Sequence, residues 1–189
     1  MHVLQSDLAE PFAFSQGWVT RRSATLVEVI TDEGLIGWGG AFAQGLEPPQ
    51  IAATIIESAL KPLLIGANPL ETEVLWFRQY NQSRDYGRKG SVIAAISAID
   101  TALWDIAGQA HGVPVATLLG GNFRTQVQPY ATGFYRISGQ GEAARLADEA
   151  RRHRAAGFTR MKVKLGFGVD DDLAVMQAVQ QAIDGQGVR

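Results

Sequence analysis

Residues 94–121 read AAISAIDTALWDIAGQAHGVPVATLLGG, and this stretch decides the fold of the first part of the chain. Within this stretch and just before it, apolar residues recur at spacings of three and four residues. This spacing is typical of a helix with one buried face. We therefore predict a helix over 91–110, with Ser91 as its N-terminal cap. Gly112 and Pro114 end it, because glycine readily closes a helix and proline cannot continue one. The periodic apolar positions are Val92, Ile96, Ile99, Leu103 and Ile106.

Upstream of this helix, two apolar runs predict a β-hairpin. The run 24–31, ATLVEVIT, is rich in β-branched residues, which favours a strand. Asp32-Glu33-Gly34 follows as a turn, and a second strand covers 35–39. The glycines of this region do not predict a dinucleotide-binding loop, because that motif requires a strand, then glycines, then the start of a helix. A further strand over 2–4 is predicted to be short.

Two shorter helices are predicted between the hairpin and the long helix. The first runs from Pro48 to a terminus marked by Pro62 and Gly66, and the second covers 70–84. The spacing of four residues predicts one buried face for the first helix. That face carries Ile51, Ile55, Ala59 and Leu63.

After Gly120-Gly121 the pattern changes to an alternation of strands and helices. Strands are predicted over 127–133 and 158–165, and helices over 142–156 and 169–183. Such alternation favours parallel β-α-β architecture. The sequence therefore predicts two domains, an α+β domain over 1–123 and two β-α units over 124–189.

Lys162 and Lys164 lie two residues apart in the second of these strands, so their side chains point to the same face. Met161, Val163 and Leu165 take the other face and are expected to pack under the helices. Two ammonium groups this close repel each other, which lowers the pKa of at least one of them. A lysine with a lowered pKa can act as a general base near neutral pH. The alternative is a solvated strand face that happens to carry two lysines.

Composition and charge exclude several classes of function. The chain has 189 residues with 17 basic and 19 acidic side chains, a net charge of −2, so no basic excess indicates nucleic acid or an anionic membrane as a partner. It has no cysteine, which excludes disulfides, thiolate metal sites and cysteine nucleophiles. The N-terminus lacks the pattern of a signal peptide. Polar residues break the apolar stretches before the roughly 20 residues needed to span a membrane, and we expect a cytoplasmic protein.

Three features together resemble the N-terminal part of the mandelate racemase and muconate lactonizing enzyme family, within the enolase superfamily. They are the hairpin over 25–39, the helix and turn over 94–121, and the strand MKVKLG over 161–166. The resemblance implies an α+β capping domain with antiparallel hairpin strands and a helical bundle. It also implies that the first two β-α units of an incomplete TIM-like (β/α)7β barrel follow.

The resemblance also implies a reaction. In this family a base removes the proton α to the carboxylate of a small-molecule substrate, and Mg²⁺ stabilises the resulting enediolate. By similarity, Lys164 is the base and Lys162 is the neighbour that lowers its pKa. An acid-sugar dehydratase is the first reaction expected, and a racemase or epimerase the second.

Four further residues are candidates for substrate binding. Phe14, Gln16 and Trp18 precede the hairpin, in a loop that the resemblance expects to close over the substrate; the alternative is a surface loop with anchoring aromatic residues. Arg88 lies in a basic stretch before the long helix. It is a candidate to meet a substrate carboxylate, or else part of a solvated lead-in to that helix.

No metal ligand is expected in this chain, because the resemblance places the metal carboxylates on the next three barrel strands, beyond Arg189. Asp170-Asp171-Asp172 is expected to begin a helix rather than to bind a metal. We therefore expect a partial enzyme that needs a complementary barrel half, with a homo-oligomer as a further expected assembly. The alternative is a truncated, non-catalytic fragment that acts at most as a folded interaction module.

Overall fold

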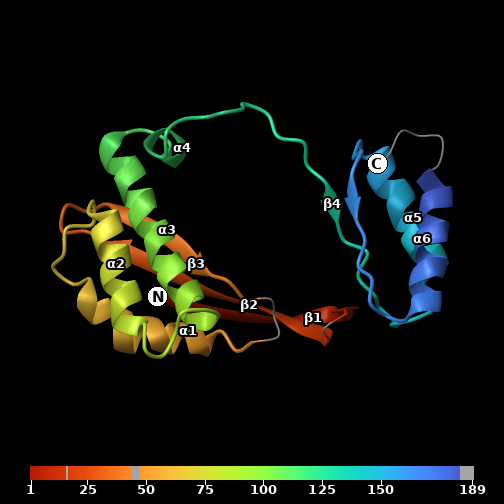
Figure 1. Ribbon diagram of the computed structural model, residues 1–189, viewed down its shortest axis with the longest axis horizontal. Coiled ribbons are helices and arrows are strands. Elements are labelled where there is room, and N and C mark those ends of the chain that lie inside the picture. The colour runs from red at the N-terminus through yellow and green to blue at the C-terminus, as the bar shows by residue number, and fades with distance from the viewer. Residues whose placement is uncertain (16, 44–46, 184–189) are drawn as a thin grey trace. The chain divides into compact units, whose positions relative to one another are not determined.

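The computed structural model describes residues 1–15, 17–43 and 47–183, which form two compact units. The first unit holds residues 1–7 and 21–123, and the second holds residues 8–20 and 124–189. Figure 1 shows the helices and strands of both. The two strands that begin the chain therefore contribute residues to both units.

The sheet has the strand order β1 (His2–Phe14), β2 (Gly17–Ile30) and β3 (Ile36–Ala41). Strands β2 and β3 pair antiparallel, from Thr25 opposite Ala41 to Ile30 opposite Ile36, which confirms the predicted hairpin. The prediction of a short first strand is wrong, because β1 continues through 13 residues. Hydrogen bonding along β2 supplies the backbone of β1 with partners, and this holds polar residues in a strand that their side chains do not favour.

Helix α3 (Ser91–His111) confirms the helix predicted over 91–110. Gly112 closes it in the left-handed conformation, with φ of 66°, as expected. Ser91, however, is the first helical residue rather than the cap. Its hydroxyl donates a hydrogen bond to Glu47 at 3.0 Å, and Gly90 takes the cap position.

Close packing of α3 on β3 requires glycine in the strand (Figure 1). A Cβ atom on Gly37 would lie 2.1 Å from the carbonyl oxygen of Ala102, and one on Gly39 would lie 1.9 Å from that of Ala98. The Asp105 carboxylate joins the same two elements, since it accepts a hydrogen bond from the Trp38 N–H at 2.9 Å. The glycines of the hairpin therefore allow a helix to approach the strand.

The prediction that polar residues interrupt the apolar stretches before a membrane-spanning length is wrong for α3. Within the described residues, α3 is the helix long and apolar enough to cross a membrane by length and composition. About 56% of its apolar window is buried inside the protein. That burial accounts for its apolar character, because a helix at the centre of a core is apolar on most of its surface.

The helical segment after β3 changes type along its length. It consists of α1 (Gln50–Ile55), a π-helical turn over Ile56–Leu60 and a 3-10 turn over Lys61–Leu63. The buried face predicted for this segment is wrong by one position along the chain, because tertiary packing selects between two neighbouring stripes that share the same spacing of four residues. The buried residues of the segment over 50–63 are Ala52, Ala53, Ile56 and Leu60.

The next helix is α2 (Thr72–Ser83).

The second unit contains the predicted alternation of strand and helix. Strand β4 (Ala131–Thr132) pairs parallel with β5 (Met161–Lys162), and each is followed by a helix, α5 (Ala143–Ala155) and α6 (Val169–Ile183). Both strands are shorter than predicted, because only these two residues of each strand pair with the other. The short helix α4 (Val115–Leu118) precedes them in the first unit.

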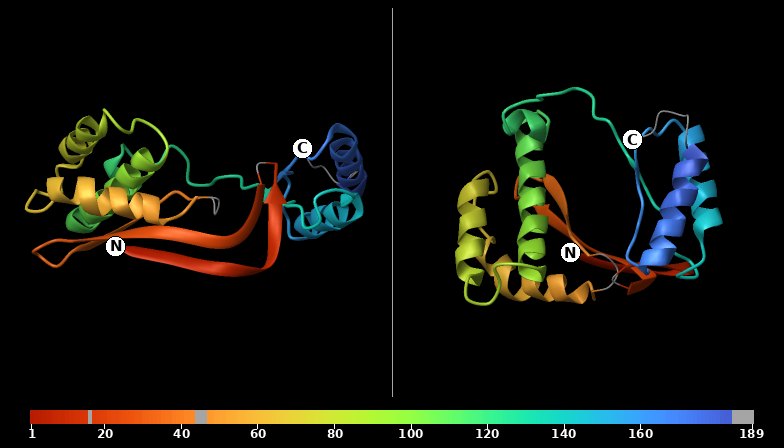
Figure 2. Two further views of the ribbon diagram at one scale, coloured as in Figure 1. Left: turned by 90° about the horizontal axis from the view of Figure 1, so that it is seen from below. Right: turned by 45° about the vertical axis from the view of Figure 1, so that its right-hand side comes forward.

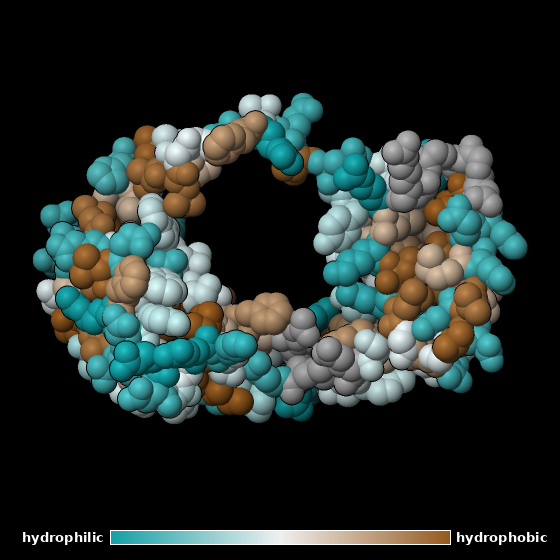
Figure 3. All heavy atoms as spheres, in the orientation of Figure 1, coloured by the Kyte–Doolittle hydropathy of each residue, from teal (hydrophilic) through white to brown (hydrophobic). Residues whose placement is uncertain are grey.

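Helices α5 and α6 lie side by side (Figure 2) and share a core with the strands. Met161 and Val163 pack against this core, as predicted, whereas Leu165 is 41% exposed. Hydrophobic residues also reach the surface of both units (Figure 3). The fully or nearly buried core residues are Phe134, Leu146, Ala150, Val175, Val179 and Ile183.

Glu142 fixes the loop that follows β4. Its Oε1 accepts hydrogen bonds from the N–H groups of Ile137, Ser138 and Gly139 at 2.8, 2.7 and 3.0 Å. Its Oε2 accepts one from the Arg145 guanidinium at 2.6 Å. Burial raises the pKa of Glu142, but the Ser138 N–H and the Arg145 guanidinium outweigh it, so the pKa lies below its usual range.

The close approach of α3 to β3 leads to a stability prediction. We expect Gly39→Ala to lower the free energy of unfolding of the first unit by about 2 kcal/mol, because the added methyl group overlaps the Ala98 carbonyl. Urea unfolding, monitored by tryptophan fluorescence, measures this free energy. The matched control is Gly40→Ala, whose Cβ would meet its nearest atom, Leu26 Cδ2, at 3.5 Å. Equal urea midpoints for the two variants would contradict the prediction.

The environment of Glu142 leads to a prediction about pH. Because its folded-state pKa is lowered, ionised Glu142 stabilises the fold fully above its ordinary pKa of 4.5. This stabilisation is lost as pH falls through the folded-state pKa. We expect Glu142→Gln to lower the free energy of unfolding by about 1–3 kcal/mol at pH 7. The loss should become progressively smaller below a pH of about 4. Urea unfolding at several pH values tests this, with the exposed turn residue changed in Glu33→Gln as the control. A cost that is the same at pH 7 and at pH 3 would refute it.

Candidate functional site

The two predicted lysines lie at the end of β5 and just beyond it. Met161 and Val163 point into the core, so the alternation of the backbone places Lys162 and Lys164 on the opposite side. Lys162 is exposed and Lys164 is half-buried. Within residues 1–15, 17–43 and 47–183, neither lysine forms an ion pair with a carboxylate.

An aromatic ring lies beside Lys164. The Nζ atom of Lys164 is 5.5 Å from the ring centroid of Tyr135, which is within the range of a cation–π interaction. Tyr135 follows β4, so the carboxyl ends of both parallel strands contribute to this place. Its ring in turn contacts that of Phe12 in β1, with centroids 4.4 Å apart.

A buried guanidinium fixes the loops around the lysines. Arg136 has no exposed side-chain surface, and its Nη1 lies 2.8 Å from Asp171 while its Nη2 lies 3.5 Å from Asp172. It also lies over the Phe167 ring, 4.7 Å from the centroid. Asp172 accepts a hydrogen bond from the Gly166 N–H at 2.7 Å. The start of α6 thus holds both the residue after Tyr135 and the loop after Lys164.

The end of β1 and the following Ser15 also contact these loops. The N–H of Ala13 donates to the Arg136 carbonyl at 2.6 Å, and the N–H of Arg136 donates to the Ala13 carbonyl at 2.9 Å. Gly166 has φ of +107°, and a Cβ on it would lie 2.6 Å from Cβ of Ser15. Glycine is therefore required there for both conformation and space.

The residues predicted to bind substrate are divided between the two units. Phe14 ends β1 and is half-buried, and Trp18 lies in β2 and is 48% exposed; both are in strands rather than in the expected loop. Gln16 lies outside the described residues. Arg88 is exposed in the first unit, just before α3. The structure thus groups Phe14 and Trp18 with the lysines in the second unit and assigns Arg88 to the first.

Sequence reasoning missed Tyr135 and Phe12 as part of this site. A usable signal existed for Tyr135, because it follows a predicted strand, and barrel enzymes place functional residues at the carboxyl ends of their strands. No local signal exists for Phe12. Its role depends on a contact with a segment far along the chain.

The described residues do not form a magnesium site. The carboxylates of Asp171 and Asp172 are engaged by Arg136 and by loop N–H groups, including that of Gly141 at 2.7 Å from Asp171. As predicted, the aspartate run lies in the first turn of a helix, α6. Across the described ranges, no group of three or more His, Asp or Glu side chains is placed to hold a metal ion.

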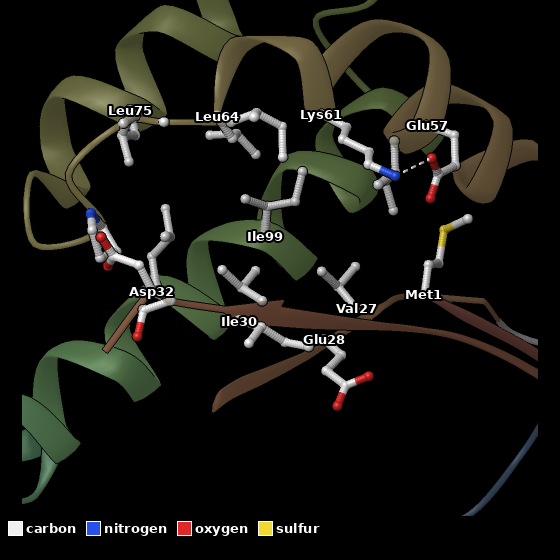
Figure 4. A pocket seen from close by; sticks show the side chains of 18 residues that line it. Met1, Val27, Glu28, Ile30, Asp32, Glu57, Lys61, Leu64, Leu75 and Ile99 are labelled. Atoms are coloured by element: carbon white, nitrogen blue, oxygen red, sulfur yellow. Dashed lines mark hydrogen bonds and ion pairs between the residues drawn. The ribbon is translucent and has the colours of Figure 1, made fainter. Parts of the chain in front are cut away.

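A cavity of about 360 Å³ lies in the first unit, between β2 and the helical segment after β3 (Figure 4). Its wall includes the apolar residues Val27 and Ile99, and Lys61 pairs with Glu57 beside it at 2.9 Å. It contains none of the candidate site residues. The lysine site is therefore distinct from this cavity.

Known proteins match nearly the whole chain. Residues 2–120 match the family described as mandelate racemase / muconate lactonizing enzyme, N-terminal domain. The chain is 40% identical over 182 residues to D-galactarolactone cycloisomerase of Agrobacterium fabrum, covering 96% of this chain and 47% of that protein. It is 36% identical over 163 residues to arabinonate dehydratase of Saccharolobus solfataricus, covering 86% of this chain and 42% of that protein.

A solved structure agrees with these matches. The crystal structure of the 3,6-anhydro-D-galactonate cycloisomerase from Zobellia galactanivorans is similar with a TM-score of 0.81 and 37% identity, covering 95% of this chain and 48% of that one. The chain spans about half the length of these relatives. Its three-stranded sheet with helices, followed by parallel β-α units, matches their N-terminal part. On this evidence, the chain belongs to the mandelate racemase and muconate lactonizing enzyme family of the enolase superfamily.

Proposed function

We propose that this chain supplies the capping domain and the base for removal of the proton α to the carboxylate of a sugar acid or its lactone. The observation that carries the proposal is the placement of Lys162 and Lys164 on one side of β5, opposite the core. The relatives are named for galactarolactone, arabinonate and anhydrogalactonate, which supports this class of substrate.

Lys164 acts as the base in this proposal. Its neutral amine accepts the α-proton, and the electrons of the C–H bond move into the carboxylate to give an enediolate. Lys162, on the same side of the strand, is the charged neighbour of this base. The loops that hold Lys164 are fixed by Arg136 and by the hydrogen bonds of Asp172, which favours a constant position for the base.

Elimination is the first choice for the step that follows proton removal. Loss of the β-hydroxyl as water would give a dehydratase, and loss of a β-oxygen that belongs to a ring would open the ring instead. The identities to a cycloisomerase and a dehydratase favour elimination over racemisation, which instead requires a second base on the opposite face. The substrate carboxylate is the partner that the exposed ammonium of Lys162 would attract.

The family is generally dependent on Mg²⁺, and we extend this dependence to the complete enzyme. The described residues of this chain do not fit a magnesium site. The steps proposed here therefore concern only the proton that Lys164 removes. The remaining barrel strands are the partner that the site requires, whether they come from the same polypeptide or from another.

The test uses the gene product as encoded, including anything that follows Arg189 in the reading frame. Incubated with galactarolactone, galactonate or arabinonate in D₂O containing Mg²⁺, it should turn over at least one of them, as followed by ¹H NMR. We expect Lys164→Met to reduce this turnover by about 10³-fold, in the range for loss of a general base.

The matched control is Lys61→Met, which removes an exposed lysine paired with Glu57 and should leave turnover near the wild-type rate. Wild-type turnover in Lys164→Met would overturn the role of the lysine. If the folded gene product processes none of the sugar acids, the proposal fails and the non-catalytic interaction module takes its place.

A further inference from the structure

Of the two lysines, Lys164 is the one whose ammonium group faces an aromatic ring. Its Nζ lies 5.5 Å from the centroid of Tyr135, close enough for attraction between the positive charge and the face of the ring. Lysine has a flexible stem of four carbons, so without such a contact its ammonium group samples many positions. The ring therefore restricts a side chain that would otherwise be mobile.

Tyr135 is itself held in place from several directions. Its ring contacts that of Phe12 at 4.4 Å, with the two planes inclined by 48°. Its carbonyl accepts a hydrogen bond from Arg145 at 2.5 Å. The next residue, Arg136, is fully buried and exchanges two backbone hydrogen bonds with Ala13. The ring of Tyr135 thus contacts β1, its carbonyl is bonded to α5, and the backbone of the next residue pairs with β1.

We propose that Tyr135 and Phe12 are positioning residues that hold the Lys164 amine where it meets the substrate. The proposal rests on the proposed function of Lys164 as the base. A base must lie within hydrogen-bond reach of the proton that it removes. Displacement of a catalytic group by about 1 Å can cost about 100-fold in rate. Neither aromatic residue takes part in the bond changes.

This inference changes the role of the first strand. By resemblance, the segment around Phe14, Gln16 and Trp18 is expected to close over the substrate. Phe12, which lies in β1 with Phe14, supports the ring beside Lys164. The beginning of the chain then contributes to the base as well as to substrate enclosure.

Nuclear magnetic resonance of the Lys164 side chain in the gene product as encoded tests the contact directly. Lys164→Arg assigns the ¹H–¹³C signal of Lys164 at Cε, because that signal disappears from the spectrum, and Lys61→Arg and Lys89→Arg assign the two reference signals in the same way. We expect the Lys164 Hε signal to lie upfield of those of Lys61 and Lys89, because of the Tyr135 ring. Tyr135→Leu should remove the upfield shift, and Tyr135→Phe should keep it.

Phe12→Leu should reduce the upfield shift in part, because Tyr135 loses one support. Amide spectra that match the wild type verify the fold of each variant. If Tyr135→Leu does not fold, Tyr135→Phe together with Phe12→Leu decides the question. A Lys164 signal that lies with those of Lys61 and Lys89 in the wild type, or that Tyr135→Leu leaves unchanged, would refute the contact.

Kinetics of the complete gene product test the positioning role. We expect Tyr135→Leu to lower kcat by about 10- to 100-fold while KM changes little, because the base is displaced but the substrate still binds. Tyr135→Phe should restore kcat, since the ring is retained. A rise in KM at constant kcat would assign Tyr135 to substrate binding and overturn the inference.

The two proposals fail in different ways. Wild-type turnover in Lys164→Met contradicts the base, whatever the NMR result. An unshifted Lys164 signal contradicts the aromatic contact, even if Lys164→Met is inactive.

Discussion

The buried guanidinium of Arg136 is the constraint on which the functional end of the second unit depends. A charge without exposed surface is stable only when it is paired, because removing it from water costs several kcal/mol. Asp171 and Asp172 supply the opposite charge from the start of α6. Because Asp172 also accepts a hydrogen bond from Gly166, the same pairing holds the loop that follows Lys164. One electrostatic requirement thereby fixes the ends of both β-α connections.

The first unit depends on close apolar packing instead. Gly37 and Gly39 leave room for the backbone of α3, and the Asp105 carboxylate adds one hydrogen bond from the Trp38 N–H across that approach. The two units therefore differ in the interactions that hold them together. In the second unit, the Arg136 guanidinium lies 2.8 Å from Asp171, and the N–H groups of Gly141 and Gly166 donate hydrogen bonds to Asp171 and Asp172.

Much of the fold could be predicted from local patterns. The period of three to four residues identified α3, the β-branched run identified the hairpin, and the alternation of patterns identified the parallel units. The shared side of Lys162 and Lys164 followed from their spacing of two residues in a predicted strand. The length of β1 and the buried face of α1 could not be predicted, because β1 is extended by its neighbouring strand and α1 is oriented by its contact with the core. Tyr135 could be suspected from its place after a strand, but Phe12 could not.

The sequence by itself determined the type and order of the elements, the family, and the shared side of Lys162 and Lys164. The family followed from the resemblance of three motifs. The elements and the shared side of the lysines followed from residue spacing, which acts over a few residues. Only the tertiary structure decided that Phe12 meets Tyr135, that Tyr135 lies beside Lys164, and that Arg136 is buried against Asp171 and Asp172. The physical reason is that these contacts join segments far apart in the chain, and they form only when packing of the whole unit brings those segments together.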